Sequence, residues 1–108
     1  MTPLVGLWEE QKSLNASGYE VRFGWIALED APGRVASLQE FLRADERPDY
    51  GWMILDFAAG ETRLAQGRTN NWVSAKRAAE EALWQSLTAE QQAAVTQRVA
   101  TKEASRGA

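Results

Sequence analysis

The sequence predicts one α+β domain in which a small, mainly antiparallel sheet of three or four strands packs against two or three helices. Three observations lead to this prediction. Side chains alternate with period 2 over residues 19–28, two similar eleven-residue stretches each begin with an aromatic residue, Gly and Trp, and the C-terminal part of the 108-residue chain has helical spacing. We place the domain at residues 1–102 and expect residues 103–108 to form a frayed tail.

The two similar stretches cover residues 23–33 and 50–60, and five of their eleven positions are identical. The match stops at their flanks, so we interpret the two stretches as the same strand-and-turn structure occurring twice in a single sheet. Trp25 and Trp52 hold equivalent positions. We expect these two indoles to form one aromatic cluster with Phe23 and Tyr50, which would organise neighbouring strands.

Residues 4–14 are compatible with two elements. Thr2 as N-cap and Pro3 at the first helical position favour a short helix. Gly6 weakens that helix, and the turn-forming residues 15–18 favour an edge strand closed into a hairpin. The sequence leaves both alternatives open.

The middle of the chain predicts strands and one helix. The strand at residues 19–28 carries Val21, Phe23 and Trp25 on one strongly apolar face. Apolar residues at i, i+3, i+6 and i+7 from Val35 predict an amphipathic helix over residues 34–45. The stretch from residue 50 to 57 is apolar on both faces, as in a central strand, and the more polar residues 62–68 predict a strand towards an edge.

The C-terminal part is predicted to be helical. Asn70 or Asn71 caps a helix, and residues 88–91 have the spacing of a capping box that starts a final helix with Val95 and Val99. We expect the first of these helices to pack closely on the sheet through a stripe of mostly small residues: Trp72, Ala75, Ala79, Ala82, Leu83 and Ser86.

The composition argues against an enzyme. The chain has no His and no Cys, so Ser-His-Asp and Cys-His arrangements cannot be built. We predict no catalytic residues, no cofactor and no metal site, with a carboxylate-dependent enzyme kept only as a third hypothesis. The lack of cysteine, of a signal-like start and of an apolar run of about 20 residues predicts a cytoplasmic protein with no membrane role.

Aromatic and basic residues provide the strongest functional signal. Five tryptophans in 108 residues suit a protein interface, where Trp, Tyr and Arg act as anchors. We expect one or two of these rings to reach solvent, with Trp72 and Trp84 as the best candidates. The candidate binding residues are Arg63, Arg68, Asn70, Asn71, Trp72, Lys76, Arg77 and Trp84. They predict a small non-enzymatic protein-binding module or inhibitor, with a single-stranded or structured nucleic-acid-binding protein as the alternative. A homodimer stays open.

Two partial resemblances accompany these patterns. Residues 78–87, together with residues 37–40 and 48–50, are similar to parts of a double-stranded-RNA-binding domain. This resemblance covers roughly half the chain and implies at most a related shape, so its function is not carried over. Residues 6–9 and 47–50 resemble short sequence segments found in small phage and plasmid proteins. This implies an accessory or anti-defence (anti-CRISPR-like) setting for the predicted inhibitor.

Overall fold

The computed structural model describes residues 2–42, 47–58 and 60–106. The elements follow in the order η1 (Pro3–Leu7), β1 (Glu9–Leu14), β2 (Glu20–Ala27), β3 (Arg34–Leu42), β4 (Pro48–Asp56), β5 (Thr62–Thr69), α1 (Trp72–Gln85) and α2 (Ala89–Arg106). The strands form one antiparallel sheet in which each pairs with the next along the chain, from β1 to β5. The α+β class and the antiparallel sheet are therefore confirmed, with five strands instead of three or four.

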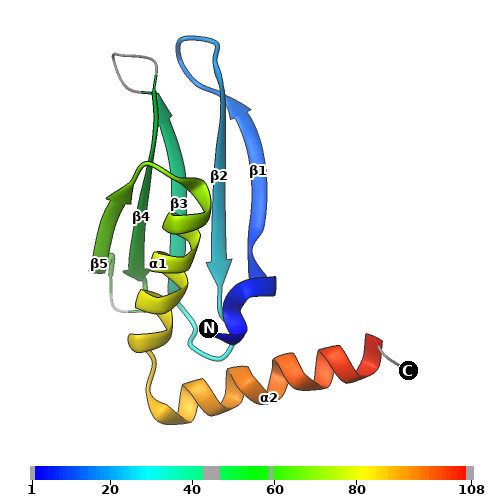
Figure 1. Ribbon diagram of the computed structural model, residues 1–108. Coiled ribbons are helices and arrows are strands. Elements are labelled where there is room, and N and C mark those ends of the chain that lie inside the picture. Colours follow the sequence, from blue (N-terminus) through cyan, green and yellow to red (C-terminus); the bar gives the residue numbers. More distant parts are fainter. Residues whose placement is uncertain (1, 43–46, 59, 107–108) are drawn as a thin grey trace.

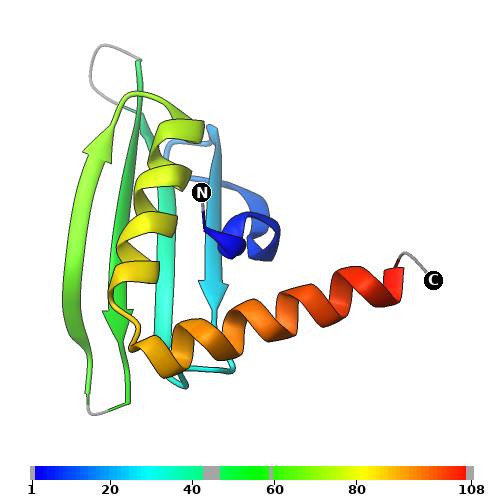
Figure 2. The same ribbon diagram turned by 60° about the horizontal axis from the view of Figure 1, so that its bottom comes forward.

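The sheet and helices form two layers (Figure 1). Helix α1 crosses one face of the sheet over β3, β4 and β5, and η1 lies beside it. Helix α2 turns away from α1 and runs past one end of the sheet, beyond which its C-terminal half extends (Figure 2). It continues through residues 103–106, and residues 107–108 lie outside the described part. Among the described helices, none is long and apolar enough to cross a membrane.

The core lies between the sheet and α1. Ile26, Ala36 and Ile54 from the strands pack with Leu83 of α1 and Leu4 of η1, and all five are buried. The predicted α1 stripe is confirmed, because Trp72, Ala75, Ala79 and Leu83 are its buried residues, together with Glu80. Helix packing thus covers one side of the sheet.

The caps that start both helices also follow the prediction. The Asn71 side chain accepts a hydrogen bond from the Ser74 amide at 3.0 Å. Thr88 and Gln91 form the reciprocal pair of a capping box, since each side chain accepts from the other residue's amide, at 2.9 and 3.1 Å. These local signals could be predicted because each joins residues only three positions apart.

The N-terminal segment contains both of the predicted elements, a short helix followed by an edge strand. Thr2 accepts a hydrogen bond from the Leu4 amide at 3.3 Å and Pro3 begins η1, which ends at Leu7. The chain then extends into the edge strand β1, and Gly18 closes the hairpin to β2 with a φ of 83°.

The helix predicted at residues 34–45 is wrong, because residues 34–42 form strand β3. This strand pairs with β2 on one side and β4 on the other, and these backbone hydrogen bonds outweigh a helical spacing of apolar side chains. Ala36 and Leu38 face the core at alternating positions. The correspondence of residues 37–40 with the first helix of a double-stranded-RNA-binding domain is lost with that helix. Residues 43–45 of the predicted helix lie outside the described residues.

The two similar stretches lie on β2 and β4, with β3 between them. Trp25 is opposite Ser37, and Ser37 is opposite Met53, not Trp52. Successive side chains of a strand point to opposite faces, so this offset of one residue puts the two tryptophans on different faces of the sheet. The expected four-ring cluster is therefore wrong.

Each face has its own ring pair instead. Phe23 stacks on Trp25 with ring centroids 5.8 Å apart, on the face away from α1. Tyr50 meets Trp72 edge to face at the same centroid separation, between the sheet and α1.

Candidate binding face of the sheet

The face of the sheet turned away from α1 carries no described helix (Figure 1). We call it the uncovered face. Its side chains follow from the register, which aligns Glu9, Trp25, Ser37, Met53 and Gln66 in one row across the five strands. The adjoining rows are Gln11, Phe23, Gln39, Gly51 and Arg68 on one side, and Ala27, Val35, Leu55 and Arg63 on the other; Val21, Phe41 and Asp49 complete the face.

Strand β2 turns its more apolar side to this face. The stacked rings of Phe23 and Trp25 stay partly exposed, whereas the side of β2 that faces α1 carries Arg22 and Gly24 before it reaches Ile26. Arg22 lies over the Trp72 ring at 4.4 Å from its centroid. An alternating strand normally turns its apolar side to the core, so the reversed polarity of β2 is the most informative property of this face.

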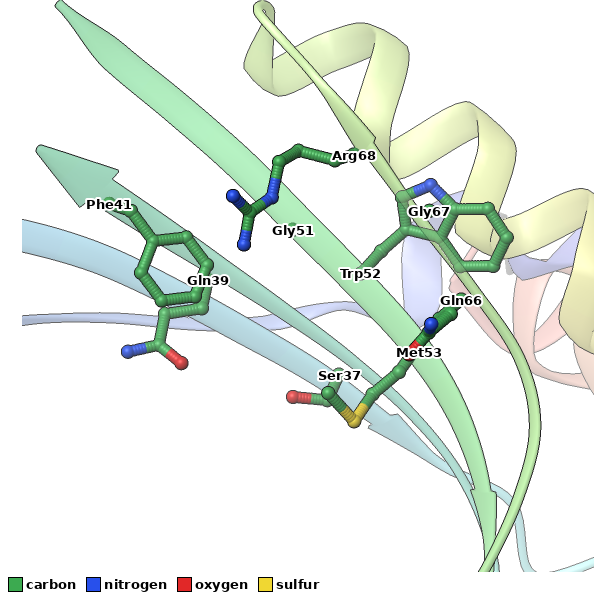
Figure 3. A pocket seen from close by; sticks show the side chains of 9 residues that line it. All are labelled: Ser37, Gln39, Phe41, Gly51, Trp52, Met53, Gln66, Gly67 and Arg68. Atoms are coloured by element: carbon green, nitrogen blue, oxygen red, sulfur yellow. The ribbon is translucent and has the colours of Figure 1, made fainter. Parts of the chain in front are cut away.

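The ring pair Phe23 and Trp25 forms an apolar strip on β2. A pocket of about 410 Å³ opens beside it (Figure 3). Its lining includes Gly51, whose lack of a side chain leaves room for the Phe41 ring. Phe41, which is 37% exposed, and Arg68 form one wall, with the guanidinium carbon 5.3 Å from the ring centroid. Met53 and Gln66 lie on the other side of Gly51. The uncovered face therefore has both partly exposed rings on β2 and a pocket that reaches β4.

Charge is distributed unevenly across this face. Arg63 and Arg68 stand on the edge strand β5, and Glu9 stands on the opposite edge strand β1. Arg63 donates a hydrogen bond to the Gln66 side chain at 2.8 Å, and Arg68 pairs with Asp49 at 3.4 Å. One edge is basic and the other acidic, with an apolar strip between them.

The structure divides the predicted site residues between the two sides of the sheet. Arg63 and Arg68 belong to the uncovered face, and Asn70 and Asn71 lie in the turn between β5 and α1. The residues on α1 point elsewhere and do not form one patch with the two arginines.

The expectation that Trp72 reaches solvent is wrong. Its side chain lies between α1 and the sheet, the residue is 8% exposed, and its indole nitrogen donates to a Glu10 carboxylate oxygen at 3.0 Å. Trp84 is partly buried and packs against the main core. Both rings therefore contribute to packing inside the fold.

Lys76 and Arg77 connect α1 to acidic partners. Lys76 pairs with Glu10 at 3.5 Å. Arg77 pairs at 2.8 Å with Glu80, which is 1% exposed and also accepts a hydrogen bond from the Trp8 indole at 2.6 Å. Two indole–carboxylate hydrogen bonds, from Trp8 and Trp72, therefore fasten η1 and β1 to α1. We call this group the N-terminal latch: Trp8, Glu10, Trp72, Lys76, Arg77 and Glu80.

Two groups on the covered side have shifted pKa values. The Ala58 amide and the Arg34 guanidinium donate to Asp56 at 2.8 and 3.1 Å and lower the pKa of its carboxyl group. Burial raises the pKa of the Tyr50 phenol, and a hydrogen bond to Glu40 raises it further. Both shifts come from packing within the fold.

The uncovered face combines partly exposed rings, a pocket and two arginines. Among the described residues, no three His, Cys, Asp or Glu side chains gather in a way that could hold a metal ion. Sequence reasoning missed Phe41, Gly51 and Met53 as surface residues because it placed them in a helix or a central strand. The available signal was the alternation over residues 19–28, whose strongly apolar face is the one that lies on the uncovered side.

Comparisons of this chain with protein-family models, curated proteins and solved structures find no match. Its function must therefore be inferred from the chemistry of the uncovered face itself.

Proposed function

We propose that this chain is a small non-enzymatic protein-binding module that binds its partner through the uncovered face. The supporting observation is the orientation of β2, whose aromatic side stays outside the core with Phe23 and Trp25 stacked on it. Exposed apolar patches framed by polar residues mark interaction sites. In protein interfaces, such patches have aromatic anchors at the centre and a polar rim.

The proposed contact has two parts. The stacked rings on β2 bury apolar area against the partner, and the pocket over Gly51 receives a protruding partner side chain. Arg63 and Arg68 on β5 then form the rim, where they favour an acidic partner surface and fix its orientation. A module of this kind acts as an inhibitor by covering a functional surface, and an accessory or anti-defence protein of a phage or plasmid is the setting we propose.

Single-stranded nucleic acid is the second candidate. Aromatic rings on a sheet face stack bases in several nucleic-acid-binding modules, and arginines on a neighbouring strand contact phosphate. The stacked Phe23 and Trp25 favour this candidate. Its weakness is charge, because Glu9 and Asp49 offset Arg63 and Arg68 on the same face and the whole chain has a net charge of −3.

Capture from native-host extract tests the protein-binding proposal. Trp25→Ser removes an anchor from the uncovered face, and Val73→Ser is the matched control because Val73 is 57% exposed on α1. We expect Trp25→Ser to lose the captured protein and Val73→Ser to retain it, with little change between low and moderate salt. Equal capture by both folded variants would show that the uncovered face is not the site.

An oligonucleotide panel tests the alternative. Nucleic-acid binding that depends on Arg63 and Arg68 should weaken steeply between low and moderate salt. If no oligonucleotide binds even at low salt, the nucleic-acid candidate is excluded.

A further inference from the structure

We propose that the partner seated on the uncovered face is a second copy of this chain, related by a two-fold axis that runs parallel to β3. This inference rests on the proposed function of the uncovered face as a protein-binding surface, and it names the occupant. The supporting argument is that the face is self-complementary in shape and charge under this one rotation.

The geometry of the rotation follows from the strand order. Strand β3 is the central strand, with β2 and β4 on either side and β1 and β5 at the edges. A two-fold axis parallel to β3, lying between two stacked sheets, places β2 of each copy over β4 of the other and each β1 over the other β5. Aligned sheets of this kind pack about 10 Å apart.

Shape complementarity arises because rings on one strand meet a hollow on the other. Phe23 is in the same cross-strand row as Gly51, and Trp25 is in the same row as Met53. The rotation therefore brings the ring pair of one copy over the pocket of the second copy. The unbranched thioether of Met53 adapts its shape readily and contacts aromatic rings favourably.

On the axis, each side chain of β3 meets the same side chain of the second copy, and the residues there can make this contact favourably. Ser37 and Gln39 are the β3 residues in these two rows. A hydroxyl group and an amide each contain both a donor and an acceptor, so each can pair with its symmetry mate. No charge meets its own copy on the axis in these rows.

Charge complementarity selects the same axis. Glu9 shares a row with Gln66, and Arg63 and Arg68 occupy the adjoining rows on β5. The rotation thus puts the acidic edge of each copy over the basic edge of the other. An in-plane axis perpendicular to the strands would stack β1 on β1 and β5 on β5, placing like charges together and rings against rings, which is unfavourable.

The available area matches a modest but specific dimer. Five strands about 4.8 Å apart and about eight residues long at ~3.3 Å per residue give a face of roughly 600 Å². Two such faces bury about 1,200 Å² in total, at the lower end of the standard range for stable interfaces. A second copy therefore matches the whole face in size, whereas a single added strand or helix, about 5–10 Å wide, would cover only part of its width of roughly 24 Å.

Sedimentation equilibrium of the full chain tests the dimer. We expect twice the 12.0 kDa chain mass for the wild type at micromolar concentrations and above. Trp25→Glu should raise the dimer dissociation constant about 30-fold or more because it places a charge at the centre of the interface. Val73→Glu, on the exposed side of α1, is the control and should leave the mass unchanged. Circular dichroism establishes that each variant is folded.

A charge reversal tests the orientation of the two copies. Glu9→Arg should weaken the dimer about fivefold, and the added Arg63→Glu substitution should restore part of that loss, because the rotation places Glu9 over Gln66, one row from Arg63. The double variant separates this arrangement from one in which β1 lies over β1, where the second substitution would give no rescue.

The outcomes separate the dimer from the proposed function. A wild type that stays monomeric up to near-millimolar concentration overturns the dimer, as does a dimer that Trp25→Glu leaves intact. If the wild type is monomeric but its captured protein is lost in Trp25→Ser, only the second copy is wrong and the protein-binding face stands. If it is monomeric and capture does not depend on Trp25, both proposals fail.

Discussion

The two faces of the sheet are built from the same five strands but use their large side chains differently. On the covered face, Ile54 is fully buried and Trp52 lies against Gly67, with α1 closing the layer. On the uncovered face, Phe23 and Trp25 of β2 stay partly exposed, with no described helix over them. The difference teaches that apolar content does not decide which face of a strand is covered. The position of α1 does, because α1 lies over β3, β4 and β5 and leaves the core side of β2 to smaller or polar groups.

The largest expected effect compares two adjacent residues of β4. Ile54→Ala leaves a cavity in the core and should lower the free energy of unfolding by about 2–5 kcal/mol. Met53→Ala removes a partly exposed side chain from the uncovered face and should cost about 1 kcal/mol. Urea denaturation measures both. Equal losses would mean that the uncovered face contributes to the core as much as the covered one.

A second comparison concerns the N-terminal latch. Glu80→Ala should destabilise the fold by about 2 kcal/mol, because the Trp8 indole loses its acceptor and Arg77 loses its partner. Glu81→Ala is the control, since Glu81 is exposed and bonds only to Gln85 among the contacts described. Thermal unfolding measures the stability loss of each variant. If the two losses are equal, the buried carboxylate does not hold η1 to α1.

Two glycines give a smaller contrast between the faces. A Cβ atom on Gly67 would lie 2.6 Å from the Trp52 ring, which is packed against the core, so Gly67→Ala should cost about 1.5 kcal/mol. A Cβ atom on Gly51 would meet Phe41 at 2.9 Å, but this ring is exposed and can turn away. We expect Gly51→Ala to cost less in chemical denaturation. The reverse order would indicate that Phe41 is held rigidly on the uncovered face.

The smallest expected effect is an acid dependence of stability that originates on the covered side. The pKa of Asp56 is lower in the folded chain than in the unfolded chain. Its stabilising contribution is therefore complete above the unfolded-state pKa of about 3.9 and is lost as the pH falls towards the folded-state pKa. Denaturation of the wild type and Asp56→Asn between pH 6 and about pH 3 should show a weaker pH dependence in the variant. Parallel curves would contradict this.

Local signals predicted much of the fold from the sequence. The Asn71 cap, the Thr88–Gln91 box, the stripe of α1 and the edge position of β5 each depend on neighbouring residues or on composition, and all are found. Strand β3 could not be predicted in this way, because its state depends on pairing with β2 and β4, which neighbouring residues do not encode.

The candidate site was harder to predict. Of the predicted binding residues, Arg63 and Arg68 lie on the uncovered face, whereas Trp72 and Arg77 belong to the N-terminal latch. The face of each tryptophan depends on cross-strand register, and an offset of one residue separates Trp25 from Trp52. Two similar stretches of sequence can therefore occupy opposite environments in one sheet.

The N-terminal latch has a consequence for how the chain assembles. Trp8 and Glu80 are 72 positions apart in the sequence, and Glu10 and Trp72 are 62 apart, whereas each strand of the sheet pairs with its sequence neighbour. Neighbouring hairpins close short loops and form early, and distant contacts form later. Strand β1 can therefore pair with β2 as soon as both have been synthesised, but its contacts with α1, and those of η1, can form only after α1 has emerged. The N-terminal latch is thus one of the last parts of the fold to close.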